Sequence, residues 1–265
     1  MPSELVTNFQ YIRISNKNRA YGTPSNFVMD LSNDTRLQRI KSCWIQSVSV
    51  PNVFYNIDSH NNKFIINYGG SDVQIDVEPG FYSAAAIMSE IESQINTASA
   101  PETVVLTLDS ITRKITFTFS DPTAQIFSTD TQPVNSTIAP YLGIITTSAA
   151  GLTTYTADEI PDLSGENMVF LHSKDINLGN TTISTNGSIN SISTNRNVSA
   201  FCSVPVRVPF LGIIHYESEG SVIDHVNLVG ARDMANIHIK LRSSDGRILH
   251  LGENHELIIV LKCFY

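Results

Sequence analysis

Histidine and carboxylate side chains that lie close together in the sequence are the residues with which this chain could do chemistry. Among its seven histidines, the pairs that could serve as metal ligands or as a general base with its orienting group are His215 with Glu217 and His225 with Asp224. An imidazole and a carboxylate can share a metal ion, or act as a general base and the group that orients it. Adjacent residues of a strand point to opposite faces, so Asp224 is not expected to orient His225 as a catalytic triad requires.

The other histidines have no catalytic or metal-binding pattern around them. His238 lies between Ile237 and Ile239, an alternation that puts it on the solvated face of a strand. The remaining histidines are His60, His172, His250 and His255. No nucleophile elbow, phosphate-binding loop, Cys-x-x-Cys or His-Glu-x-x-His motif occurs. We therefore expect surface or interface histidines, with no catalytic, cofactor-binding or metal-binding residues, no cofactor and no enzymatic activity.

The cysteines indicate neither a disulfide framework nor a zinc site. Cys43, Cys202 and Cys263 are odd in number and widely spaced, and each lies in an apolar run. A free thiol in such a run behaves as a small buried hydrophobe. We expect three buried, unpaired thiols.

Composition and charge exclude several classes of protein. Charged residues make up 16% of the chain, below the roughly 25% of an average globular protein. The formal charge is −8, from 17 basic and 25 acidic residues, and the basic residues form no cluster, which argues against direct nucleic-acid binding. No signal-peptide pattern begins the sequence and no window of about 18 apolar residues occurs. We expect synthesis in the cytosol and no membrane span.

The elements that would have to position any site are mostly strands. Alternating apolar residues predict strands at Phe9–Ile14, Phe27–Leu31 and Ile40–Val50, separated by Asn, Asp, Gly and Pro turns. Pro51 has no backbone N–H to donate to a neighbouring strand and is expected to end the third one. Short strands with polar turns between them are typical of a two-sheet β-protein.

Residues 56–164 have a different pattern and are expected to form an inserted α+β domain. The predicted strands are Lys63–Tyr68, Asp72–Val77, Thr103–Leu108 and Lys114–Phe119. Between them a helix is predicted to begin at Ser83, whose hydroxyl can cap the free N–H groups, and to present Ile87, Ile91 and Ile95 on one face. Thr146–Thr156 is interpreted as a loop that closes the domain.

The strand pattern resumes after Glu166 and continues to the C-terminus. The predicted strands are Met168–Leu171, Val198–Val208, Phe210–Tyr216, Ser221–Val229, Ile237–Leu241, Ile248–Leu251 and Leu257–Phe264. Ser244-Asp245-Gly246 predicts a hairpin, and residues 180–199 an exposed polar loop. With the first three strands these suffice for an all-β fold, a single eight-stranded jelly roll formed by 1–55 and 165–265 and interrupted by the insertion.

The two ends of the chain are expected to behave differently. Leu257–Tyr265 is apolar without alternation, which predicts a strand covered on both faces, either central in a sheet or buried by a neighbouring subunit. Met1–Thr7 contains few apolar residues and is interpreted as an arm that orders on assembly.

Short motifs through most of the chain resemble one family of viral proteins. They are Asn26–Leu31, Val50–Ile57, Asn61–Ile66, Pro79–Tyr82, Tyr141–Gly143 and the closing strands of 237–264. In this order they are similar to the single jelly-roll penton proteins of virophages, polinton-like viruses and large DNA viruses. The resemblance implies a structural capsid protein that forms the fivefold vertices of an icosahedral double-stranded DNA virus, with the inserted domain projecting outward.

The same resemblance implies the partners and the location. We expect a homopentamer that contacts the major double jelly-roll capsid protein, located in the virion after synthesis in the host cytoplasm. The alternative is a minor capsid or attachment module whose inserted domain binds a host glycan or another capsid protein. A jelly-roll enzyme such as a cupin would require histidine and carboxylate side chains to converge inside the barrel, with His215 and Glu217 as the residues to test.

Overall fold

The computed structural model describes residues 8–32, 39–68, 70–129, 136–176, 182–184, 197–218 and 225–265, of which 182–184, 197–199 and 225–232 are described by their backbone. The chain forms two compact units. The jelly-roll unit contains the chain up to Phe54 and most of the chain from Glu166 onward, and the inserted unit contains Tyr55–Gly165.

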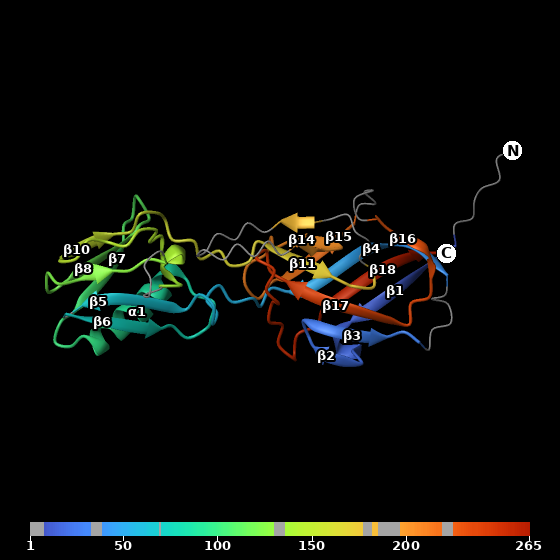
Figure 1. The fold of residues 1–265 in the computed structure, drawn as a ribbon, viewed down its shortest axis with the longest axis horizontal. Coiled ribbons are helices and arrows are strands. Elements are labelled where there is room, and N and C mark those ends of the chain that lie inside the picture. The colour runs from blue at the N-terminus through green and yellow to red at the C-terminus, as the bar shows by residue number, and fades with distance from the viewer. Residues whose placement is uncertain are drawn as a thin grey trace. The chain divides into compact units, whose positions relative to one another are not determined.

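Two antiparallel five-stranded sheets form the jelly-roll unit (Figure 1). The first has the order β1–β18–β4–β15, with β16 also paired to β4. Its strands are β1 (Phe9–Ser15), β18 (Ile258–Phe264), β4 (Ile40–Pro51), β15 (Ile213–Glu217) and β16 (His225–Arg232). The second has the order β14–β11–β17–β3–β2. Its strands are β14 (Cys202–Pro205), β11 (Met168–His172), β17 (Asn236–Arg242), β3 (Asn26–Asp30) and β2 (Tyr21–Thr23). A separate pair contains β12 (Thr182–Ser184) and β13 (Asn197–Ser199).

The connectivity is that of a jelly roll. β15 pairs with the end of β4 and β16 with its beginning, so the two act as one strand position beside β4. Numbered along the chain without the short β2, the eight strand positions run 1-8-3-6 in one sheet and 2-7-4-5 in the other. First and last strands are therefore neighbours, as in two wrapped Greek keys. The predicted all-β single jelly roll is confirmed.

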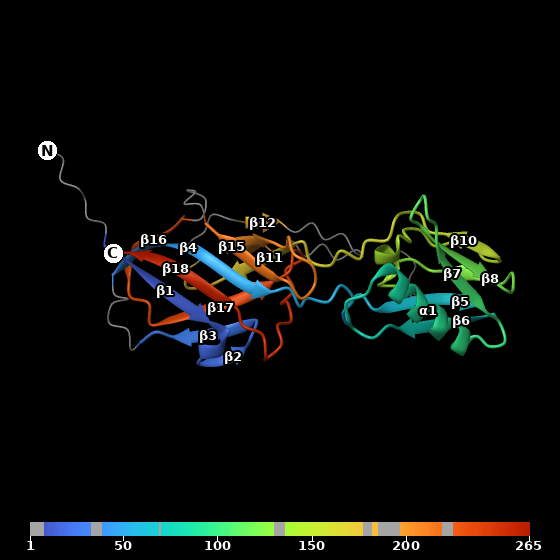
Figure 2. The same cartoon turned by 180° about the vertical axis from the view of Figure 1, so that it is seen from behind.

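Alternating side chains of both sheets form the core of this unit. Ile14, Val48 and Ile259 of the first sheet and Phe27 and Ile237 of the second belong to one buried cluster. The prediction that the last strand is covered on both faces is wrong, because buried and half-buried residues alternate along β18. The strand is central, between β1 and β4 (Figure 2). Its outer face, which includes Lys262, is half-buried.

The inserted unit has its own core between two small sheets and one helix. One sheet contains β6 (Ser71–Asp76), β5 (Lys63–Tyr68) and β9 (Gln125–Ile126), and the other β10 (Thr154–Thr156), β8 (Ile115–Phe119) and β7 (Val104–Leu108). As predicted, the Ser83 hydroxyl accepts the Ala86 N–H at the start of α1 (Ala84–Ala98), and Ile87, Ile91 and Ile95 are buried. No helix in the described part of the chain is long and apolar enough to cross a bilayer.

Some predicted elements differ from those observed. Thr154–Thr156, interpreted as part of a loop, pairs with β8 as an edge strand. Of the predicted strand Ile248–Leu251 only a bridge between Ile248 and Arg242 forms, next to the expected turn in which Gly246 has φ of 84°. Short 3-10 helices occur at Asn16–Asn18 and Ala139–Leu142. The expected arm Met1–Thr7 and most of the polar loop 180–199 lie outside the described residues.

Candidate functional site

Among the described residues, the structure brings one of the two candidate histidine–carboxylate pairs together. His215 Nε2 lies 3.1 Å from Glu217 Oε1, and both side chains are more than half exposed on the outer face of β15. They do not converge inside the jelly roll, as a cupin-like site requires. The second pair is not described, because Asp224 and the side chain of His225 lie outside the described residues.

His238 is less exposed than the alternation predicted. Its side chain is half-buried, and its Nε2 lies 2.8 Å from Asn26 Oδ1 on the neighbouring strand β3. Its backbone N–H donates to Asp175 Oδ2 at 2.7 Å. Burial, together with the positive charges of Lys240 and Lys174, lowers the pKa of His238 below its ordinary value. The imidazole thus links β17 to β3 through its contact with Asn26.

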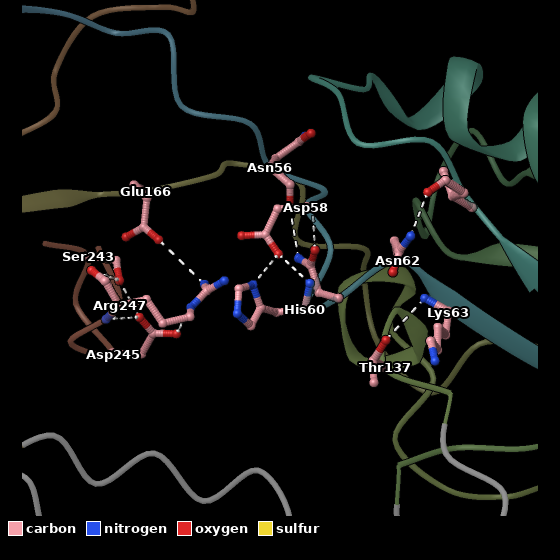
Figure 3. Close-up of polar contacts among 12 residues, drawn as sticks. Asn56, Asp58, His60, Asn62, Lys63, Thr137, Glu166, Ser243, Asp245 and Arg247 are labelled. Atoms are coloured by element: carbon pink, nitrogen blue, oxygen red, sulfur yellow. Dashed lines mark hydrogen bonds and ion pairs between the residues drawn. The ribbon is translucent and has the colours of Figure 1, made fainter. Parts of the chain in front are cut away.

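The remaining polar clusters of the described residues are small and structural. Asp58 Oδ1 accepts the backbone N–H of His60 at 2.7 Å and lies 3.3 Å from the imidazole Nδ1, an exposed contact (Figure 3). In the jelly-roll unit, Arg247 pairs with Asp245 and lies 3.8 Å from Glu166. Nowhere in the described ranges do three or more His, Cys, Asp or Glu side chains gather as metal ligands would.

Asn56 joins the two ends of the inserted unit. Its Nδ2 donates to the carbonyl oxygens of Tyr82 and Leu163, each at 2.8 Å, and its Oδ1 accepts the Tyr82 N–H at 2.8 Å. Asn61 donates to the Asn56 carbonyl at 2.9 Å. Since Asn56 is buried, these bonds satisfy groups that water does not reach. The first and last segments of the insertion are thereby held together.

Asp158 organises the loop of the inserted unit that contains Ile145 and Thr146. One carboxylate oxygen accepts the backbone N–H groups of Ile145 and Thr146, at 2.9 and 3.0 Å, and the Tyr155 hydroxyl at 3.2 Å. Burial alone would raise the pKa of Asp158, but these hydrogen bonds outweigh it and hold the pKa below its ordinary value. Burial and the Asp158 charge raise the pKa of Tyr155.

An aromatic cluster around one lysine lies on the outer face of the first sheet. Tyr11, Lys262 and Trp44 are directly opposite one another across β1, β18 and β4, and Phe9 is opposite Phe264. Cross-strand partners share a face of the sheet. Lys262 Nζ lies 4.1 Å from the Phe9 ring centre and 5.0 Å from that of Trp44. Phe9 and Tyr11 remain 49% and 52% exposed.

The opposite edge of the same sheet carries a second exposed apolar group. Leu211, in the loop before β15, is 71% exposed, and Ile213 is 65% exposed. Asn52 fixes this loop: its carbonyl accepts the Leu211 N–H at 2.7 Å, and its N–H donates to the Gly212 carbonyl at 2.8 Å. Leu211 has φ of 69°, a left-handed conformation uncommon outside glycine. The loop therefore holds a large apolar side chain in solvent in a strained backbone.

Sequence reasoning missed both apolar groups. Exposure of Phe9 and Tyr11 depends on β1 being an edge strand, and that of Leu211 on a loop whose hydrogen bonds come from Asn52, far away in the chain. The one available signal was the alternation in β1, which places Phe9 and Tyr11 on the same face. The predicted burial of Cys43, Cys202 and Cys263 is confirmed.

Of three comparisons with known proteins, two found a match. The model of the family described as "Family of unknown function (DUF5901)" matches residues 14–244. No curated protein matches the chain. The crystal structure of the selenomethionine-labelled penton protein of mavirus is similar over 97% of this chain and 99% of that chain, with 9% sequence identity and a TM-score of 0.48.

Proposed function

The chain belongs to DUF5901, a family whose description names no function, and we infer from its own structure that it is a structural capsid protein. The observation that carries this proposal is an eight-stranded jelly roll with two different exposed apolar groups at the opposite edges of one sheet. Neighbouring exposed apolar side chains can mark protein–protein contacts.

Two different edge surfaces fit a ring. Head-to-tail contacts between identical subunits require two distinct surfaces on each copy, and they close into a ring when the rotation permits. In this chain the β1 edge presents Phe9 and Tyr11, whereas the β15 edge presents Leu211 and Ile213. We propose that these surfaces meet between neighbouring copies. Backbone strain at Leu211 supports this assignment, since strained residues concentrate at functional positions.

The finer proposal concerns the vertex. The family that the sequence motifs resemble forms fivefold capsid vertices, and we propose the same arrangement here. Residues 1–55 and 165–265 would form the wall of a pentamer in contact with the major double jelly-roll capsid protein, and 56–164 would be displayed on the outside of the virion. The separate core of the inserted unit supports this division, because it does not depend on side chains of the jelly roll.

Incorporation into shells tests the proposal. The full chain is co-expressed with the major capsid protein of the same virus, and assembled particles are purified and imaged. We expect this chain at the fivefold vertices. Ile213→Ser in the jelly-roll unit should reduce its incorporation, whereas Ile111→Ser, at a side chain 89% exposed in the inserted unit, should not. The proposal would be contradicted if the wild-type chain were absent from the assembled particles, or if it occupied their threefold positions.

A further inference from the structure

Two of the three thiols face each other inside the jelly-roll unit. Cys43 of β4 and Cys263 of β18 are direct partners in the antiparallel register. Their Sγ atoms lie 2.8 Å apart, and both side chains are completely buried. The third thiol, Cys202, is on β14 of the other sheet and has no part in this contact.

We propose that Cys43 and Cys263 are an oxidisable pair that forms a cross-strand disulfide and locks the C-terminal strand to β4. Directly opposed residues of antiparallel strands have Cα atoms about 4.5 or 5.5 Å apart. Disulfides span Cα separations of about 4.4–6.8 Å. The bond therefore forms with little movement of either strand, in contrast to any pairing with Cys202 across the core.

Oxidised glutathione, a small disulfide, supplies the chemistry. The thiolate of one cysteine attacks a sulfur of the oxidant, forms a mixed disulfide and releases one glutathione thiolate. The second protein thiolate then attacks the cysteine sulfur of that mixed disulfide and releases the other glutathione. The protein loses two electrons and two protons, and one glutathione disulfide becomes two glutathione thiols.

Burial determines when this reaction takes place. The contact with Cys263 and burial both raise the pKa of the Cys43 thiol. Both side chains are fully buried in the folded protein, so they are shielded from the oxidant. Exchange occurs when β18 opens locally or before it has paired during folding. The protein made in a reducing compartment is therefore dithiol, and it becomes linked on folding or opening in an oxidising one. This inference does not depend on the proposed capsid role.

The disulfide would join two strands that are far apart in the chain. Cys43 and Cys263 are separated by 220 positions. A bond that closes so long a loop restricts the unfolded chain strongly and should raise Tm by roughly 5–15 °C. Its location between the last strand and β4 means that β18 would be the element protected from opening.

Thiol trapping tests the pair directly. The full-length protein is refolded in mixtures of reduced and oxidised glutathione at graded ratios and alkylated under denaturing conditions. Mass spectrometry of the intact protein counts the alkylated thiols, and peptide mapping identifies them. We expect three alkylated thiols under reducing conditions and one, Cys202, under oxidising conditions, together with a linked Cys43–Cys263 peptide and a higher Tm.

Two variants separate this pair from general oxidation. Cys202→Ala should form the same linkage, whereas Cys43→Ala should form none and show no oxidant-dependent change in Tm. If Cys43→Ala does not fold, the peptide map of the wild-type protein alone shows whether Cys43 and Cys263 are linked. Three alkylated thiols at every glutathione ratio, or a disulfide that contains Cys202, would overturn the inference.

Discussion

Lys262 is a cation held among aromatic rings on the outer face of the central strand of its sheet. The rings of Phe9, Trp44, Phe264 and Tyr11 all lie within 6 Å of its Nζ. Such contacts stabilise a partly desolvated cation by about 0.5–2 kcal/mol. Because the rings come from β1, β4 and β18, the lysine joins three strands that are distant in sequence.

Removing the Lys262 charge should weaken the jelly-roll unit. Lys262→Met keeps a long apolar side chain but removes the cation, and we expect it to lower the free energy of unfolding by about 1 kcal/mol. Urea denaturation measures the difference, with Lys41→Met at an exposed site on β4 as the matched control. A variant as stable as the wild type would show that the aromatic cluster does not depend on the charge.

Asp158 should make the stability of the inserted unit depend on acidic pH. Its pKa in the folded protein lies below its ordinary value, so its stabilising contribution is present above the unfolded pKa and is lost as pH falls through the folded pKa. We expect Asp158→Asn to reduce the loss of Tm between about pH 5 and pH 3, measured by thermal unfolding. Asp121→Asn is the control. An unchanged pH profile in Asp158→Asn would contradict the assigned hydrogen bonds.

At the scale of elements, local patterns predicted the longer strands and the helix but not the short strands. Ser83 and the isoleucines of α1 carry a complete signal in adjacent turns, and β4 is long and rich in apolar residues. Thr154–Thr156 has no comparable signal, because its extended form depends on pairing with β8. The exposed apolar groups at the two sheet edges could not be predicted either, because strand order determines which apolar residues face solvent.

Asn56 should be the most sensitive polar residue at the base of the inserted unit. Asn56→Ala would remove three hydrogen bonds and leave partly buried backbone groups of Tyr82 and Leu163 without these partners. The expected loss is about 2–4 kcal/mol in the free energy of unfolding of that unit. Hydrogen exchange of the α1 amides measures it. Asn67→Ala, at an exposed contact with Asp72, should have little effect, and equal effects of the two substitutions would contradict this role.

At the scale of the whole molecule, the jelly-roll topology places β1 and β15 at opposite edges of one sheet. That arrangement gives each subunit two distinct surfaces. The inserted unit interrupts neither β1 nor β15, because it enters the chain between β4 and β11. The count and spacing of the alternating segments predicted a single jelly roll. The assembly could not be predicted in this way, because no local motif encodes the rotation between neighbouring copies.

The mass of the assembly formed by the full chain tests the central claim most directly. A subunit of 29.2 kDa that closes into a fivefold ring should give, by native mass spectrometry, a complex of five times that mass. Ile213→Ser should give more monomer and less pentamer than the wild type, whereas Ile111→Ser should give the same proportions as the wild type. A stable trimer of the wild-type chain, or a pentamer that is indifferent to Ile213→Ser, would contradict the account of a vertex ring closed through the β1 and β15 edges.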